Sequence, residues 1–127
     1  MRVLWSWLME LVDLPTPPDP AEWVERFAML GLGVEAVERV GDDWVFDLET
    51  TTNRPDWTGM LGIAREVAAA CRGRLRLPEV RLKETDPPAF QVAWVEVADP
   101  GLCYRYVGRV VVDVKVGLSP PWMVERL

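Results

Sequence analysis

The stretch 78–89 constrains the fold of this chain more than any other feature, because it divides the chain into two short blocks. Its prolines are Pro78, Pro87 and Pro88. Prolines set among charged side chains are typical of an extended linker. Residues 1–77 precede the linker and residues 90–127 follow it. We predict an α+β protein, in which a small helix and β-hairpin domain is followed by an incomplete β-sheet segment.

Two short helices are predicted at the start of the first block. Ser6 is placed to cap the first of them, over residues 6–12, and a run of prolines ends it. Asp19 can cap the second helix with its carboxylate, Pro20 suits the first turn, and Gly31 is a natural C-terminal stop. The residues expected to face the core are Trp7, Leu8, Leu11, Trp23, Phe27 and Leu30. The prolines that follow the first helix are Pro15, Pro17 and Pro18.

A β-hairpin and a third helix complete the first block. Residues 34–40 and residues 44–49 alternate between apolar and polar side chains, and residues 41–43 form a turn between them. Asp56 is placed to cap a helix over residues 57–71. The residues of that helix expected to face the core are Leu61, Ala64, Val67 and Ala68.

The second block reads as the beginning of a sheet. Strands are predicted over residues 92–97 and residues 104–116. Ser119 is then placed to cap a helix that has Pro120 in its first turn. The valines at 110–112 place apolar side chains on both faces, which is typical of a strand covered on both sides. The block is shorter than the ~40 residues at which a segment usually folds unaided. We therefore expect it to pack on the first block, pair with another copy, or be completed by a partner chain.

The composition excludes several classes of function. The net charge is −6, whereas a protein that holds nucleic acid unaided is usually basic, since phosphate contacts dominate that affinity. The chain has no histidine, which excludes Cys/His zinc sites, Ser-His-Asp triads and Cys-His dyads within it. Its two cysteines, Cys71 and Cys103, are expected to be buried, reduced thiols.

Targeting to a membrane is not indicated. Residues 3–12 are apolar, but Glu10 interrupts them and no small-residue cleavage site follows, which argues against a signal peptide. No run approaches the ~20 apolar residues that a transmembrane helix requires. We expect a cytoplasmic protein.

Two groups of residues are candidate interaction sites. Asn53-Arg54-Pro55-Asp56 is a candidate interaction loop, in which Asn53 and Arg54 could bind phosphates or a partner's carboxylate while Pro55 holds them rigid. The favoured alternative is structural: Asn53 and Asp56 satisfy turn and helix-start amides, and Arg54 forms a salt bridge with a neighbour.

The second group, Arg72, Arg74 and Arg76, is a weak basic patch that could touch RNA. Cations at a helix C-terminus more often complement the helix dipole and stay solvated.

No metal or nucleotide site is predicted. Four acidic residues could in principle offer oxygens to Mg²⁺, but their spacing forms no binding loop, so solvated turn acids are favoured. They are Asp42, Asp43, Glu49 and Asp56. Gly31-Leu32-Gly33 lacks the partners of a nucleotide-binding fingerprint. We therefore predict no cofactor and no metal.

Several stretches carry a resemblance to a known family. They are Trp7-Leu8-Met9-Glu10-Leu11-Val12-Asp13, Asn53-Arg54-Pro55-Asp56 with Gly62-Ile63-Ala64-Arg65-Glu66-Val67, Leu102-Cys103-Tyr104-Arg105-Tyr106 and Gly117-Leu118-Ser119-Pro120-Pro121-Trp122. In order and spacing they resemble the N-terminal region of the beta subunit of bacterial phenylalanyl-tRNA synthetase. That subunit usually carries an inserted OB-fold tRNA-binding domain, which a tight turn at residues 40–44 replaces here. Trp57 stands where the family usually has cysteine, and Tyr104 where proline is common.

The resemblance implies a structural part of the machinery that attaches phenylalanine to tRNA. Residues 90–127 resemble the start of the editing-associated domain, without its pocket. Aminoacylation belongs to the alpha subunit in this family, so the chain alone is expected to be non-catalytic. Its expected partners are a second copy, a synthetase alpha subunit or another protein, and tRNA only indirectly. The alternatives are a stand-alone paralogue that acts as a protein- or RNA-interaction module and, less favoured, a small-molecule binder.

Overall fold

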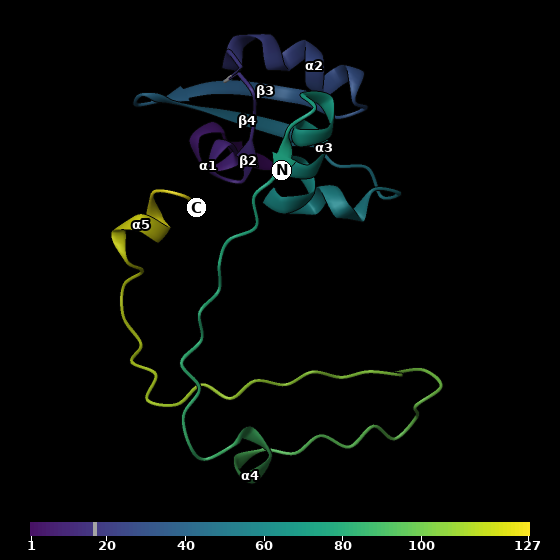
Figure 1. Cartoon of the computed structure of the whole chain (residues 1–127), viewed down its shortest axis with the longest axis vertical. Coiled ribbons are helices and arrows are strands. Elements are labelled where there is room, and N and C mark those ends of the chain that lie inside the picture. The colour runs from purple at the N-terminus through teal and green to yellow at the C-terminus, as the bar shows by residue number, and fades with distance from the viewer. Residues whose placement is uncertain (17) are drawn as a thin grey trace. The chain divides into compact units, whose positions relative to one another are not determined.

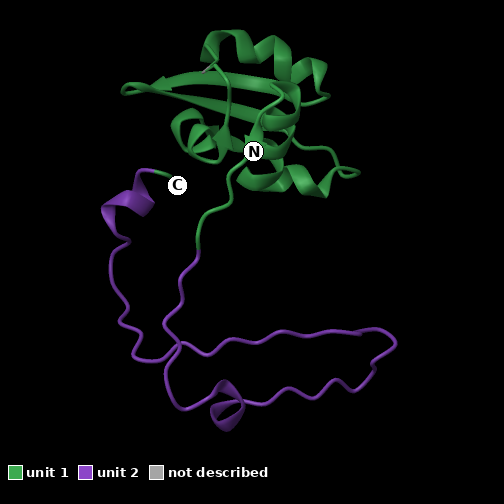
Figure 2. Ribbon diagram, viewed as in Figure 1, with its two compact units in different colours: residues 1–79, 126–127 green, residues 80–125 purple. Residues whose placement is uncertain are grey.

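The computed structural model describes residues 1–16 and 18–127, and it divides into two compact units. Unit 1 comprises Met1–Glu79 with Arg126–Leu127, and unit 2 comprises Val80–Glu125 (Figure 2). Helices are mixed with small antiparallel sheets, so the predicted α+β class is confirmed. Among the described helices, none is long and apolar enough to cross a membrane.

A three-stranded antiparallel sheet forms the centre of unit 1 (Figure 1). The strand order is β1 (Arg2–Leu4), β4 (Asp43–Glu49) and β3 (Gly33–Val40). Pairing of β3 with β4 continues to Val40 opposite Asp43, so the predicted hairpin is confirmed, with Gly41 and Asp42 alone in its turn. Gly41 has a φ of 60°, a left-handed conformation that glycine adopts readily. Strand β1 was not predicted, because three residues show no readable alternation.

The helices of unit 1 are short and partly of 3₁₀ type. They are α1 (Trp5–Glu10), the 3₁₀ turn η1 (Pro20–Glu22), α2 (Trp23–Met29), the 3₁₀ turn η2 (Pro55–Thr58) and α3 (Met60–Ala70). A second small sheet pairs β2 (Val12–Asp13) with β5 (Arg74–Leu75).

The starts of α1 and α2 differ from the prediction, while the end of α2 agrees with it. Ser6 is not the N-cap, since α1 begins directly after β1, and the Ser6 amide donates instead to the Asp43 carboxylate at 3.1 Å. Asp19 is a cap as predicted, since it accepts a hydrogen bond from the Ala21 amide at 3.0 Å. It caps the 3₁₀ turn η1, however, and α2 begins only at Trp23 without a capping side chain. Gly31, with a φ of 86°, ends α2 as predicted. The predicted helix-ending role of Pro17 lies outside the described residues.

The third helix begins later than predicted. The chain first forms η2, and α3 then starts after Gly59 without a capping side chain, because the Asp56 carboxylate is turned toward Arg54. The prediction that Asp56 caps this helix is therefore wrong. Leu61 is also not a core residue, since 39% of it is exposed. The other predicted inward residues, Ala64, Val67 and Ala68, are buried.

Aromatic rings fill the centre of the core. Trp5, Trp23, Phe27 and Phe46 contact one another in a closed cycle, with ring centroids 5.0 to 5.7 Å apart. In each of the four ring pairs the two rings are tilted or edge-on to each other, and aromatic pairs prefer such arrangements over a face-to-face stack. The cycle joins α1, α2 and β4. Further residues with no exposed surface complete this core: Val3, Leu8, Leu32, Leu48, Ile63, Ala64 and Val67.

Unit 2 has little regular structure. It contains two helices of four residues each, α4 (Ala89–Val92) and α5 (Pro121–Val124). The predicted strands over residues 92–97 and 104–116 are wrong, because no neighbouring strand pairs with either segment. The capping role predicted for Ser119 is wrong as well, since Pro120 is the N-cap of α5 and no side chain caps it. Most large apolar side chains of this unit are exposed.

Candidate interaction loop and its surroundings

The guanidinium of Arg54 is the centre of the candidate interaction loop. It donates two hydrogen bonds to the Asp56 carboxylate, at 3.0 Å from Nε and 2.8 Å from Nη2. It also donates to Glu66 Oε1 at 2.5 Å. The same group lies 3.8 Å above the ring of Trp57, within the range of a cation–π interaction. The structure therefore brings Arg54 and Asp56 together with Trp57 and Glu66, which were not predicted to contact the loop.

Glycine at position 62 allows the turn to lie directly on α3. A Cβ placed there would lie 1.6 Å from the carbonyl oxygen of Asp56, so the backbone of η2 occupies the space a side chain would need. Gly62 and Glu66 are one helical turn apart and lie on the same face of α3. That spacing is the signal from which the contact of Glu66 with the turn could have been predicted.

The charges of this cluster balance one another. The hydrogen bonds from Arg54, opposed by partial desolvation, hold the pKa of Asp56 below its ordinary value. The hydrogen bond to Asp56 raises the pKa of Arg54 further above its ordinary value, and Glu66 adds to the effect. Arg54 therefore has two carboxylates as partners already, and Asn53, Pro55 and Asp56 are the exposed residues of the loop.

Acidification should weaken this cluster. A carboxyl whose pKa is lowered in the folded state contributes stability above its unfolded pKa of about 4, and loses that contribution as the pH falls through the folded value. We expect Asp56→Asn to be less stable than the wild type at pH 7, with the difference shrinking below about pH 4. Urea unfolding at several pH values measures this difference. Asp42→Asn, in the exposed hairpin turn, is the control and should not reproduce the trend; a difference independent of pH would contradict the expectation.

The candidate basic patch lies at the end of α3 and along β5. Arg72 has a φ of 53°, and both Arg72 and Arg74 are exposed. Arg76 lies 3.6 Å from the Asp13 carboxylate across the small sheet, so part of its charge is compensated. A role of these three residues in RNA binding stays a prediction.

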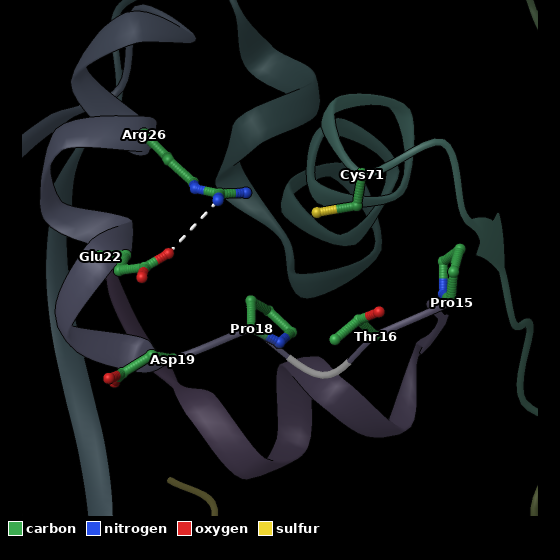
Figure 3. Close-up of a pocket in the computed structure, with 7 residues that line it drawn as sticks. All are labelled: Pro15, Thr16, Pro18, Asp19, Glu22, Arg26 and Cys71. Carbon is green, nitrogen blue, oxygen red and sulfur yellow. Dashed lines mark hydrogen bonds and ion pairs between the residues drawn. The ribbon is translucent and has the colours of Figure 1, made fainter.

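A shallow hollow of about 390 Å³ lies beside α2 (Figure 3). The figure shows the Arg26 guanidinium pointing into it, with Glu22 3.3 Å away. The hollow is lined by Pro15, Thr16, Pro18, Asp19, Glu22, Arg26 and Cys71.

The two cysteines, Cys71 and Cys103, are free thiols. Both are partly exposed, so the prediction that they are buried is wrong. Cys71 is the C-cap of α3 and lines the hollow beside α2.

Side chains suited to a metal do not gather in the described part of the chain, which holds no group of three or more candidate ligands. Among the acidic residues weighed for Mg²⁺, Asp43 accepts hydrogen bonds from the amides of Ser6 and Trp44. Asp56 faces Arg54.

Comparison with known proteins points to one family. The chain is 40% identical over all its 127 residues to the phenylalanine–tRNA ligase beta subunit of Rhodopirellula baltica. It is similar to one portion of that subunit. The corresponding proteins of a Synechococcus strain and of Geobacter sulfurreducens are 48% and 39% identical over 68% and 77% of the chain. The predicted resemblance to the phenylalanyl-tRNA synthetase beta subunit is confirmed.

The match covers little of the relatives. The chain spans 18% of the length of the Rhodopirellula protein, and 10% and 12% of the other two. No family model matches the chain, and no solved structure matches it.

Proposed function

We propose that this chain is an N-terminal portion or a truncated homologue of the phenylalanyl-tRNA synthetase beta subunit, without the inserted OB-fold domain. It contributes structure, not catalysis, to the attachment of phenylalanine to tRNA in the cytoplasm. The observation that carries the proposal is the similarity to the Rhodopirellula beta subunit along the entire chain. The direct passage from β3 to β4 through Gly41 and Asp42 supports the absence of an inserted domain.

The chemistry of the candidate loop supports a non-catalytic role. The two charged groups of the loop, Arg54 and Asp56, bind each other, and Arg54 also binds Glu66. The exposed Asn53 and Pro55 are left for contact with another protein. We propose the 53–56 turn as a rigid contact point within a larger synthetase assembly.

Unit 2 supports the need for a partner. Its exposed apolar residues include Trp94, Tyr104 and Leu118, at 79%, 93% and 100% exposure. Burial of large apolar side chains against another protein surface is favourable, because it removes their apolar area from water. We propose that a further protein surface covers these residues, either a second copy of the chain or a synthetase alpha subunit.

Co-purification tests the proposal. The chain is co-expressed with a tagged phenylalanine–tRNA ligase alpha subunit, and retention of the chain on the affinity resin is expected. The tag alone is the control. The eluted chain, separated from the alpha subunit, is then assayed for charging of tRNA with phenylalanine and for hydrolysis of mischarged tRNA. Either activity in the isolated chain would contradict the non-catalytic role. If the chain passed through the resin without being retained, the proposed association with the alpha subunit would be contradicted.

The alternative function as an RNA-interaction module predicts direct tRNA binding. We expect none tighter than about 10⁻⁵ M at physiological salt, because the net charge of −6 opposes contact with phosphates. Filter binding of labelled tRNA measures this affinity. A tighter complex that is lost when Arg72 and Arg74 are both changed to glutamate, while Arg39→Glu leaves it intact, would favour the alternative.

A further inference from the structure

Residues 106–116 form an unpaired and self-complementary segment of unit 2, with a bend at Asp113. Among the described residues, none forms a backbone hydrogen bond with any of them. The stretch contains no proline, so every residue offers both a donor and an acceptor. An unpaired run of this kind is a template for strand pairing with another chain.

The side chains of the segment divide into two sets when the backbone is extended. The even positions are all apolar or glycine: Tyr106, Gly108, Val110, Val112, Val114 and Val116. The odd positions carry the charges, at Arg109, Asp113 and Lys115. Successive residues of a strand point to opposite faces, so a strand here has one apolar and one mainly polar face. The exposure of Val111 is 77% and that of Val116 is complete, so strand pairing can remove apolar surface of these valines from water.

The charges are arranged symmetrically about Val111. Arg109 precedes it by two residues and Asp113 follows it by two. In an antiparallel pair of identical strands centred on Val111, each Arg109 therefore lies opposite the Asp113 of the other copy. The interface then contains two such pairs of opposite charge. Val110 then lies opposite Val112. Opposite charges and β-branched residues are favourable as directly facing pairs.

We propose that unit 2 pairs with a second copy of the chain, through an antiparallel ladder of residues 107–115 centred on Val111. A two-fold symmetric contact needs a surface that is complementary to itself, and opposite charges at equal distances from Val111 provide this complementarity. Asp113 has a φ of 55° in the single chain and moves to extended backbone in the ladder. The proposal specifies the partner left open in the proposed function, but it does not depend on an alpha subunit.

Charge exchange tests the register. The full chain at about 100 µM is expected to be a dimer by size-exclusion chromatography with light scattering. Arg109→Asp and Asp113→Arg each replace two attractive pairs with two repulsive ones, and we expect each to raise the dissociation constant about tenfold or more. The double variant, Arg109→Asp with Asp113→Arg, restores both pairs and should return the constant to within a few-fold of the wild type.

The matched control changes the charge by the same amount at a position that faces an uncharged residue in the ladder. Lys115 lies opposite Val107 in this register, so Lys115→Asp should dimerise more tightly than Arg109→Asp. A wild-type chain that stays monomeric would overturn the proposal. So would a dimer that the single variants leave intact, or a double variant no tighter than the single ones. None of these results bears on co-purification with an alpha subunit, so failure of this proposal and failure of the proposed function are distinguishable.

Discussion

Gly62→Ala should destabilise unit 1 by about 3 kcal/mol or more, at the upper end of the range for overpacking. The added methyl group would lie 1.6 Å from the carbonyl oxygen of Asp56 and 2.6 Å from its carbonyl carbon. Both are backbone atoms, so no change of rotamer relieves the overlap, and α3 has to separate from η2. That movement also pulls Glu66 away from Arg54. Urea unfolding followed by tryptophan fluorescence measures the loss.

Gly59→Ala is the matched control for this substitution. No atom lies within 4 Å of a Cβ at Gly59, and its φ of −148° suits any residue. We expect a change of no more than about 1 kcal/mol, since Gly59 is the N-cap of α3 and alanine is only somewhat poorer there. Equal stability of the Gly62→Ala variant and the wild type would show that η2 does not lie against α3 as described.

Phe27→Ala should cost about 3–5 kcal/mol, the range for deleting a buried aromatic side chain. Phe27 has no exposed surface, and its ring contacts both Trp23, at 5.0 Å, and Phe46, at 5.4 Å. Removal opens the aromatic cycle and leaves a cavity between α2 and β4. The midpoint of urea unfolding should fall accordingly, and Phe27→Leu should recover part of the loss because it restores most of the volume.

Phe90→Ala is the control for the aromatic substitution. Phe90 belongs to unit 2 and is 78% exposed, so its removal should leave the unfolding of unit 1 unchanged. If Phe27→Ala cost no more than Phe90→Ala, the position of Phe27 at the centre of the core would be wrong.

Local patterns predicted most of unit 1. The cap at Asp19, the stop at Gly31 and the alternation of β3 and β4 are short-range signals, and each is present in the structure. The signals that failed depend on distant residues. Strand β1 exists because residues 2–4 pair with residues 45–47, far along the chain, and this pairing moves the start of α1.

Strand propensity alone misled the prediction of unit 2. The valines of residues 104–116 favour a strand, but a strand needs a hydrogen-bonded neighbour, and the described chain supplies none. The candidate loop shows the same limit. A salt bridge of Arg54 was among the predicted alternatives, but its partner Glu66, 12 residues away, was not identified, because the only signal for it is its spacing of one helical turn from Gly62.

The hairpin turn at Gly41 and Asp42 has a consequence for how such chains gain and lose domains. The ladder is already closed by the pair Val40–Asp43, and nothing lies within 4 Å of a side chain added at Gly41. Additional polypeptide spliced in at this tip would leave the hydrogen bonds of both strands and the aromatic core untouched. Closing a longer loop adds only about 0.6 kcal/mol per doubling of its length. A whole domain can therefore be inserted at this turn, or deleted from it, at little cost in the stability of unit 1.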